Sequence, residues 1–231
     1  MPLVAAAVCP FPPLLVPGVG AGATGELDEL RAACDTAVAE LLAAEPDRIA
    51  TIGAGPEPSG AEVGRPDLPL SLAIGVWLLG RHGLAESPAA GQVVAADTPP
   101  AECARLGATY AAEARRVALL VLGDGTACRS PKAPGYLDPR AEPYDATAAR
   151  ALAQADAAAV LALDPGLAQE LRCAGRAPWQ VLAGAVIADG RRWHGRLYYD
   201  DAPYGVAYFV ATWHPPTSPT PPTPPIMNRG S

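Results

Sequence analysis

The apolar run from Val117 to Leu122 constrains the fold most, because its sequence VALLVL has no polar face. A strand without a polar face is buried on both sides, as in a sheet that lies between layers of helices. The run stops at Gly123-Asp124-Gly125-Thr126, which predicts a loop. We therefore expect a central buried strand that ends at this loop.

Shorter apolar runs predict further strands, and residues that recur at helical spacing predict helices between them. The expected strands are residues 3–8, 48–52 and 92–96, with a late hairpin from residues 191–199 and 205–213. The expected helices are residues 24–44, 68–81, 100–115, 145–157, 165–173 and 179–187. Strands that alternate with helices indicate an α/β domain, whose ligands bind where the strands reach their carboxyl ends.

Composition separates the end of the chain from the rest. Residues 214–231 are rich in Pro, Thr and Ser, and such a sequence cannot bury enough apolar surface to fold. We expect a single α/β domain over residues 1–213 and a disordered tail over residues 214–231.

Charge and cysteine content limit the partners and the compartment. The net charge is −7 and no basic stripe is present, which argues against nucleic acid and anionic membranes as partners. Five scattered cysteines without a CxxC motif favour reduced thiols in a cytoplasmic protein. Pro10, Pro12 and Pro13 interrupt the apolar N-terminus too early for a signal peptide or a membrane helix.

A long polar loop follows the central strand and holds Asp124, Cys128 and Tyr136. Loops of this length in a compact domain are usually functional or disordered. A carboxylate, a thiol and a phenol just past a buried strand indicate a ligand site. The alternative is an ordinary surface loop without a ligand.

Four segments resemble class III extradiol ring-cleavage dioxygenases, in the superfamily that also includes the Memo-like proteins. They are Val8-Cys9-Pro10, GDGTA with APGYLDPRAEPYD, AGRAPWQVLAGA at residues 174–185, and LYYDDAPYGVAYFVA at residues 197–211. The chain is similar to a divergent member of actinobacterial type. The resemblance implies a mostly parallel central sheet flanked by helices, with an active cleft at the strand ends.

The same resemblance implies an Fe(II) ion held by two histidines and a carboxylate, with a further histidine as acid and base. This chain departs from that pattern at every position. The first metal histidine falls at Cys9, the second in the Gly53–Gly55 loop, the acid/base histidine at Ala127 and the glutamate near Arg172. Its three histidines, His82, His194 and His214, lie outside these motifs. No cofactor or metal ligand is therefore predicted.

Three functional hypotheses remain open. In the first, the fold and cleft persist without ring cleavage and bind a small molecule or a partner protein. In the second, Cys9, Cys128 and Cys173 with Asp124 or Asp97 form a rebuilt Zn(II) or Fe(II) site, or one thiol acts as a nucleophile. The third is a dioxygenase with ligands from elsewhere. Buried cysteines also occur as small apolar residues without any role in chemistry.

We expect one cleft at the carboxyl ends of the strands. It takes a small polar or aromatic ligand rather than a macromolecule. Its catalytic candidates are Cys9, Asp124 and Cys128. The residues expected to line it are Cys9, Gly55, Asp97, Asp124, Thr126, Cys128, Tyr136 and Tyr204.

Overall fold

The computed structural model describes residues 3–19, 25, 27–55, 59–60, 63–84 and 91–216. The predicted tail, apart from residues 214–216, lies outside the described residues, as does the expected helix start at Thr24. The strands are β1 (Leu3–Cys9), β2 (Arg48–Gly55), β3 (Ser59–Gly60), β4 (Arg65–Pro69), β5 (Gly91–Ala95), β6 (Val117–Leu122), β7 (His194–Asp201) and β8 (Tyr208–His214). The helices are α1 (Asp28–Ala43), α2 (Leu70–Gly80), α3 (Pro100–Ala111), α4 (Ala141–Gln154), α5 (Ala157–Leu161), α6 (Pro165–Glu170) and α7 (Arg176–Asp189), with short 3₁₀ turns η1 (Pro13–Leu15) and η3 (Pro203–Gly205).

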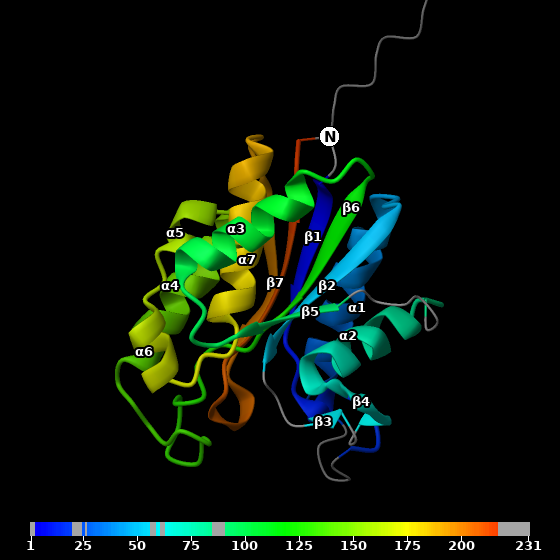
Figure 1. The fold of residues 1–231 in the computed structure, drawn as a ribbon. Coiled ribbons are helices and arrows are strands. Elements are labelled where there is room, and N and C mark those ends of the chain that lie inside the picture. The colour runs from blue at the N-terminus through cyan, green and yellow to red at the C-terminus, as the bar shows by residue number, and fades with distance from the viewer. Residues whose placement is uncertain are drawn as a thin grey trace, which may run out of the picture.

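The main sheet has six strands in the order β5-β2-β6-β1-β8-β7 (Figure 1). The first four are parallel, and β8 and β7 join β1 as an antiparallel hairpin. The expected α/β fold with a mostly parallel, helix-flanked sheet is thus present. The predicted central strand is β6, which pairs with both β1 and β2. The predicted late hairpin is β7–β8.

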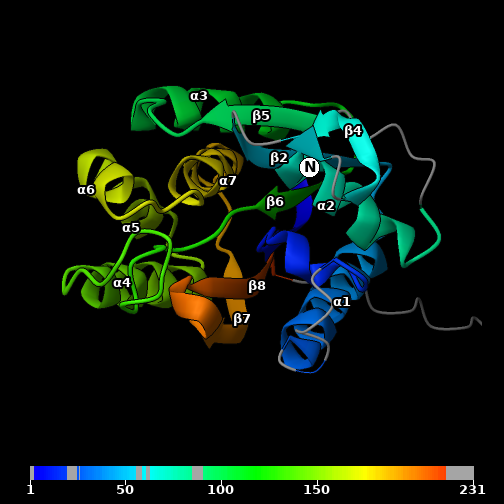
Figure 2. The ribbon, with the colours of Figure 1, turned by 90° about the horizontal axis from the view of Figure 1, so that it is seen from below.

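Helices cover both faces of this sheet. Helices α1 and α2 lie on one face, and α3, α4, α5 and α7 lie on the other, as the view from below shows (Figure 2). Alternate residues of β6 pack into the two hydrophobic cores, one on each face of the sheet. Val117, Leu119 and Val121 face α7, whereas Leu120 and Leu122 face α1 and α2. Burial on both faces explains the absence of a polar face in the sequence of β6.

Helices α3 and α7 pack with their backbones in close approach. A Cβ atom added to Gly107 would lie 2.0 Å from the Val181 carbonyl oxygen, and one added to Gly184 would lie 2.3 Å from the Ala104 Cα. Glycine at both positions is therefore a packing requirement. The arrangement holds α7 over the sheet, with its first turn at the carboxyl ends of the strands.

Several element boundaries differ from those predicted. Helix α4 begins at Ala141 rather than at Asp145, α3 ends at Ala111 rather than at Arg115, and α7 begins at Arg176 rather than at Trp179. Asp164 followed by Pro165 predicts the start of α6, and this prediction is confirmed, since the Asp164 carboxylate accepts the Leu167 N–H at 2.6 Å. None of the helices in the described residues has the length and apolarity needed to cross a membrane.

Candidate functional site at the carboxyl ends of the strands

Two chain segments pair with each other beyond the carboxyl end of β6. We call residues 123–137 and 203–207 the paired loops. Gly125 N–H donates to the Ala207 carbonyl at 2.8 Å, Ala207 N–H to Thr126 at 2.9 Å, and Arg129 N–H to Gly205 at 3.0 Å. The loop with Cys128 and Tyr136 is thereby fixed beside the turn with Tyr204, so the structure brings these three predicted site residues into one loop assembly.

A buried carboxylate anchors the first of the paired loops. Asp145 in α4 accepts the Thr126 N–H at 2.9 Å, the Thr126 hydroxyl at 2.6 Å and the Arg129 guanidinium at 3.2 Å. Burial raises the pKa of Asp145, while the hydrogen bonds from Thr126 and Arg129 act to lower it. Thr126, predicted to line the cleft, is fully buried with its hydroxyl committed to this contact.

Asp124 joins the end of β6 to both faces of the sheet. Its Oδ1 accepts the Phe11 N–H at 2.8 Å, and its carbonyl oxygen accepts the Gly175 N–H at 2.7 Å and the Cys173 S–H at 3.6 Å. The carboxylate is partly exposed. It also raises the pKa values of the nearby Cys34, Cys173 and Tyr208 side chains, in addition to the effect of burial. Asp124 is therefore the central acidic group at this edge.

The three thiols predicted to converge lie in separate surroundings. Cys9 is fully buried on the α1 face, where its thiol makes a hydrogen bond with Cys34. Cys173 lies on the opposite face, and Cys128 lies beneath Gly135 with its thiol directed at the Leu171 carbonyl, 3.4 Å away. The described residues contain no group of three His, Cys, Asp or Glu side chains set to hold a metal ion.

Burial opposes ionisation of Cys128 and Cys173. It raises the pKa of Cys173 to about 12 and raises that of Cys128. For Cys34, the hydrogen bond with Cys9 and burial raise the pKa. Helical spacing predicts that Cys34 lies in the core, but no pattern in the sequence could have indicated its contact with Cys9.

Gly55 and Asp97 lie at the side of the carboxyl edge that is formed by β2 and β5. Gly55 ends β2 opposite Ala95, and Asp97 is exposed in the turn after β5. That turn is held by Arg176 at the start of α7, whose guanidinium donates to the Thr98 carbonyl at 2.6 Å and to the Ala96 carbonyl. Arg176 was not predicted as a site residue, although an arginine inside the apolar segment AGRAPWQVLAGA was a usable signal.

Polar atoms without a partner collect around the first turn of α7. Tyr144 Oη, Arg176 Nε and Trp179 Nε1 are buried and have no hydrogen-bond partner among the described residues. Trp179 packs on Gly123 and Gly175, and Tyr144 lies close enough to Cys173 and Arg176 for their charges to affect its pKa. Unpartnered buried donors are uncommon in native proteins and often mark a bound water or ion.

Backbone strain is concentrated in and beside the paired loops. Five non-glycine residues in the described chain have left-handed backbone angles, and three of them are Tyr136, Arg172 and Tyr204. Arg172 is tied to the first loop because its guanidinium donates to the Pro134 carbonyl at 2.9 Å. Tyr136 and Tyr204 are 66% and 42% exposed. Strained backbone conformations cluster at active sites and ligand-binding segments, so these residues are candidates for function.

The four positions that the resemblance assigns to iron chemistry carry unsuitable groups. Cys9 is turned toward Cys34, Ala127 offers a methyl group, and Arg172 offers a cation. A Cβ atom at Gly53 would lie 2.4 Å from Ser71 Oγ, so α2 fills the space that a histidine would need. The residues present do not fit the implied Fe(II) ion.

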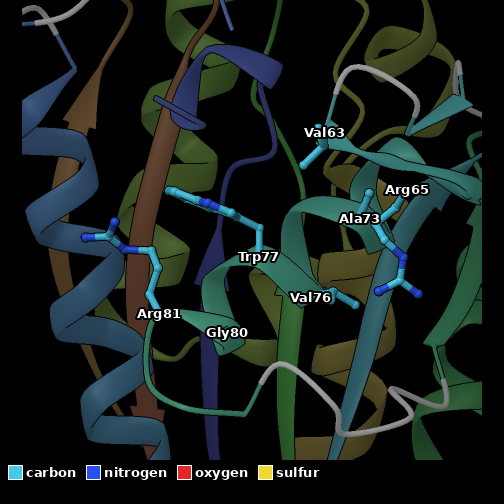
Figure 3. Close-up of a pocket in the computed structure, with 7 residues that line it drawn as sticks. All are labelled: Val63, Arg65, Ala73, Val76, Trp77, Gly80 and Arg81. Carbon is cyan, nitrogen blue, oxygen red and sulfur yellow. The ribbon is translucent and has the colours of Figure 1, made fainter. Parts of the chain in front are cut away.

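A hollow of about 430 Å³ lies along α2, apart from the predicted site residues (Figure 3). Trp77 and Arg81 border it on one side of the helix and Arg65 on the other. The Arg81 guanidinium lies 5.1 Å from the Trp77 ring centre and is held by the Asp35 carboxylate. The hollow is a concave surface against which ligand binding at the paired loops can be compared.

Comparison with known proteins leaves the chain without an assigned family. No protein-family model matches the chain, and a search of the curated proteins gives no match. The resemblance to the dioxygenases therefore depends on the four sequence segments alone.

Proposed function

We propose that this protein binds a small polar or aromatic molecule at the paired loops, and that it keeps an extradiol dioxygenase-like fold without ring-cleavage activity. The observation that carries the proposal is the pair of exposed tyrosines, Tyr136 and Tyr204, held in left-handed backbone conformations on two loops that hydrogen-bond to each other.

Holding these side chains outward has an energetic cost. A left-handed conformation costs a non-glycine residue about 1–2 kcal/mol, and exposing an aromatic ring adds to that cost. Among the described residues, four large apolar side chains are exposed, and Tyr136, Leu137 and Tyr204 belong to the paired loops. Exposed aromatic and apolar side chains on the paired loops suit a ligand with an aromatic ring.

The side chains at the positions assigned to iron binding are the reason for expecting no ring cleavage. Fe(II) that activates O₂ needs nitrogen and oxygen ligands that leave coordination positions open. Cys9, Gly53, Ala127 and Arg172 supply neither imidazole nor carboxylate at the corresponding places. We therefore expect no yellow ring-cleavage product from catechol or protocatechuate after anaerobic reconstitution with Fe(II). Formation of that product would contradict this half of the proposal.

Binding is tested with protocatechuate as the probe and intrinsic fluorescence as the readout. Wild-type protein is expected to bind with saturation, and Tyr136→Ala and Tyr204→Ala are each expected to weaken binding by about fivefold to tenfold, equivalent to roughly 1–1.4 kcal/mol. Ile187→Ala removes an equally exposed apolar side chain, 52% exposed on α7, and should leave binding unchanged. Equal weakening by all three variants, or no saturation, would contradict the proposal.

The thiol- or metal-dependent alternative has less support. It requires Cys9, Cys128 and Cys173 to act together or one of them to be ionised, whereas burial keeps all three from solvent. A dioxygenase with ligands from elsewhere would need three donors near the paired loops. A cytoplasmic location, and the absence of nucleic-acid and membrane partners, remain part of the proposal. Self-association is left to experiment.

A further inference from the structure

Two of the three histidines lie together at the amino-terminal end of the sheet, away from the paired loops. His194 begins β7 and pairs directly with His214, the last residue of β8. Directly opposed residues of an antiparallel pair point to the same face, with Cβ atoms about 4.5–5.5 Å apart. Because β7 is the edge strand, the His194 side chain is open to solvent.

A carboxylate from α1 completes this group. Helix α1 lies alongside the β7–β8 hairpin (Figure 2), and its Glu40 Oε2 lies 3.3 Å from His214 Nε2. Thr212, two residues before His214 and thus on the same face, donates its hydroxyl to Glu40 Oε2 at 2.9 Å. On the opposite face, Trp213 Nε1 donates to the Leu152 carbonyl in α4. Both histidine side chains therefore point toward α1.

We propose that His194, His214 and Glu40 form a binding site for a divalent transition-metal ion of the zinc type. Two imidazoles and one carboxylate are ligands that Zn(II) accepts, with water in the fourth position. Ligand atoms 3.3 Å apart and each about 2.05 Å from one ion subtend about 107° at it, which is close to the tetrahedral angle.

The surrounding groups act as orienting partners of the ligands. The Tyr198 hydroxyl donates to Glu40 Oε1, and the Thr212 hydroxyl donates to Oε2. Such hydrogen bonds fix the direction of a ligating carboxylate and strengthen metal binding. The one cation on the same strand that lies near the group, Arg196, has its guanidinium 4.8 Å from the Tyr198 ring centre.

Completing the site requires a change of the His194 side-chain rotamer. With the side chains as they stand, no three metal-ligating groups in the described chain are set around a common point. His194 is exposed, so rotation about its side-chain bonds meets little resistance. The ion would join α1 to the edge hairpin, and its site is separate from the thiols of the carboxyl edge.

Zn(II) titration by isothermal calorimetry tests the proposal, with the full chain, free of any histidine tag and in a buffer without chelators. We expect one Zn(II) per chain. His214→Ala should abolish the binding, and His194→Ala and Glu40→Gln should weaken it by at least about tenfold. His82→Ala is the matched control, because His82 also lies near a carboxylate, 3.7 Å from Asp35, but has no second histidine opposite.

Folding of the variants is checked separately. His194 is exposed, so His194→Ala should keep the wild-type melting temperature without metal, and Zn(II) at about 100 times the wild-type Kd should raise the melting temperature of His194→Ala less than that of the wild type. Equal affinity of the wild type and His194→Ala would overturn the proposal. So would an equal loss in His82→Ala, which would indicate adventitious surface binding.

Discussion

The two ends of the sheet carry different chemistry. At the carboxyl end, Asp124 is surrounded by buried thiols and by loops fixed to each other through backbone hydrogen bonds. At the amino end, the Glu40 carboxylate and the imidazoles of His194 and His214 lie on an open edge strand and on the helix beside it. Among the described residues, the carboxyl end has loops that hydrogen-bond to each other and no imidazoles, whereas the amino end has two imidazoles and a carboxylate close together.

This difference shows that a site cannot be located from one kind of residue alone. The dioxygenase resemblance points to the carboxyl end, where imidazoles are absent from every assigned position. Two of the three histidines, His194 and His214, lie at the other end of the sheet. In our proposals, the strained loops with exposed tyrosines bind an organic molecule, and the histidines with Glu40 bind a metal ion.

The largest expected contrast concerns the two carboxylates that organise these ends. Asp145→Ala should lower the free energy of unfolding by about 4 kcal/mol, because it leaves the Thr126 groups and the Arg129 cation without their buried partner. Glu40→Ala should lower it by about 1 kcal/mol or less, because its partners reach solvent. Urea denaturation measures both values. Equal losses would contradict the contrast in rigidity.

A second contrast compares two glycines with left-handed backbones. Gly205 has φ +77° and a Cβ atom there would lie 2.4 Å from Ser130 Oγ, whereas a Cβ atom at Gly190, with φ +73°, would meet no atom within 4 Å. Gly205→Ala should cost about 3 kcal/mol, from strain and overpacking, and Gly190→Ala about 1 kcal/mol from strain. If thermal and urea unfolding give similar losses for both, the two loops are less tightly packed than described.

The thiols at the carboxyl end give a pH-dependent prediction. Burial raises the pKa of Cys173 to about 12, above its ordinary value of 9.0, so its contribution to stability is complete below about pH 9 and is lost as pH rises through about 12. Raising the pH from 8 to 10 should lower the free energy of unfolding of the wild type by about 1 kcal/mol more than that of Cys173→Ala. The control is a thiol reagent at pH 8, which should label native protein slowly and all five cysteines after unfolding. Fast labelling of one native thiol would favour the thiol-dependent alternative.

The smallest effect is expected from shortening the chain. Composition predicts that the tail over residues 214–231 adds nothing to the folded domain, but His214 is the last residue of β8, so the shortened chain keeps it. A chain ended at Pro216 should keep both its melting temperature and its Zn(II) affinity. A drop of several degrees, seen by calorimetry, would show that this segment packs on the domain.

Local patterns in the sequence were sufficient for most of the fold. VALLVL required a doubly buried strand, and Asp164-Pro165 required a helix start, and both are present. Helix α4 was predicted to begin near Asp145. The structure instead uses this carboxylate to hold Thr126 and Arg129, and the helix begins at Ala141. The strands β3 and β4 gave no apolar run and were not predicted.

The candidate site was less predictable, because its contacts join residues far apart in the chain. Cys9 was expected to meet Cys128 and Cys173, but the direction of its side chain in β1 places it on the α1 face with Cys34. A histidine in a strand carries no motif, so His194 and His214 became a pair only once the strand register was known. Tyr136 and Tyr204 were predicted for the site, but their left-handed backbones are a tertiary property.

The most direct test of the central claim maps the binding of protocatechuate on ¹⁵N-labelled protein by NMR. We predict saturable amide shifts confined to the paired loops, including Gly125, Tyr136 and Tyr204, in the absence of added iron. Shifts centred on Trp77 and Arg81 would place the ligand in the hollow along α2 instead. That result, or the absence of saturable shifts at the paired loops, would contradict the account.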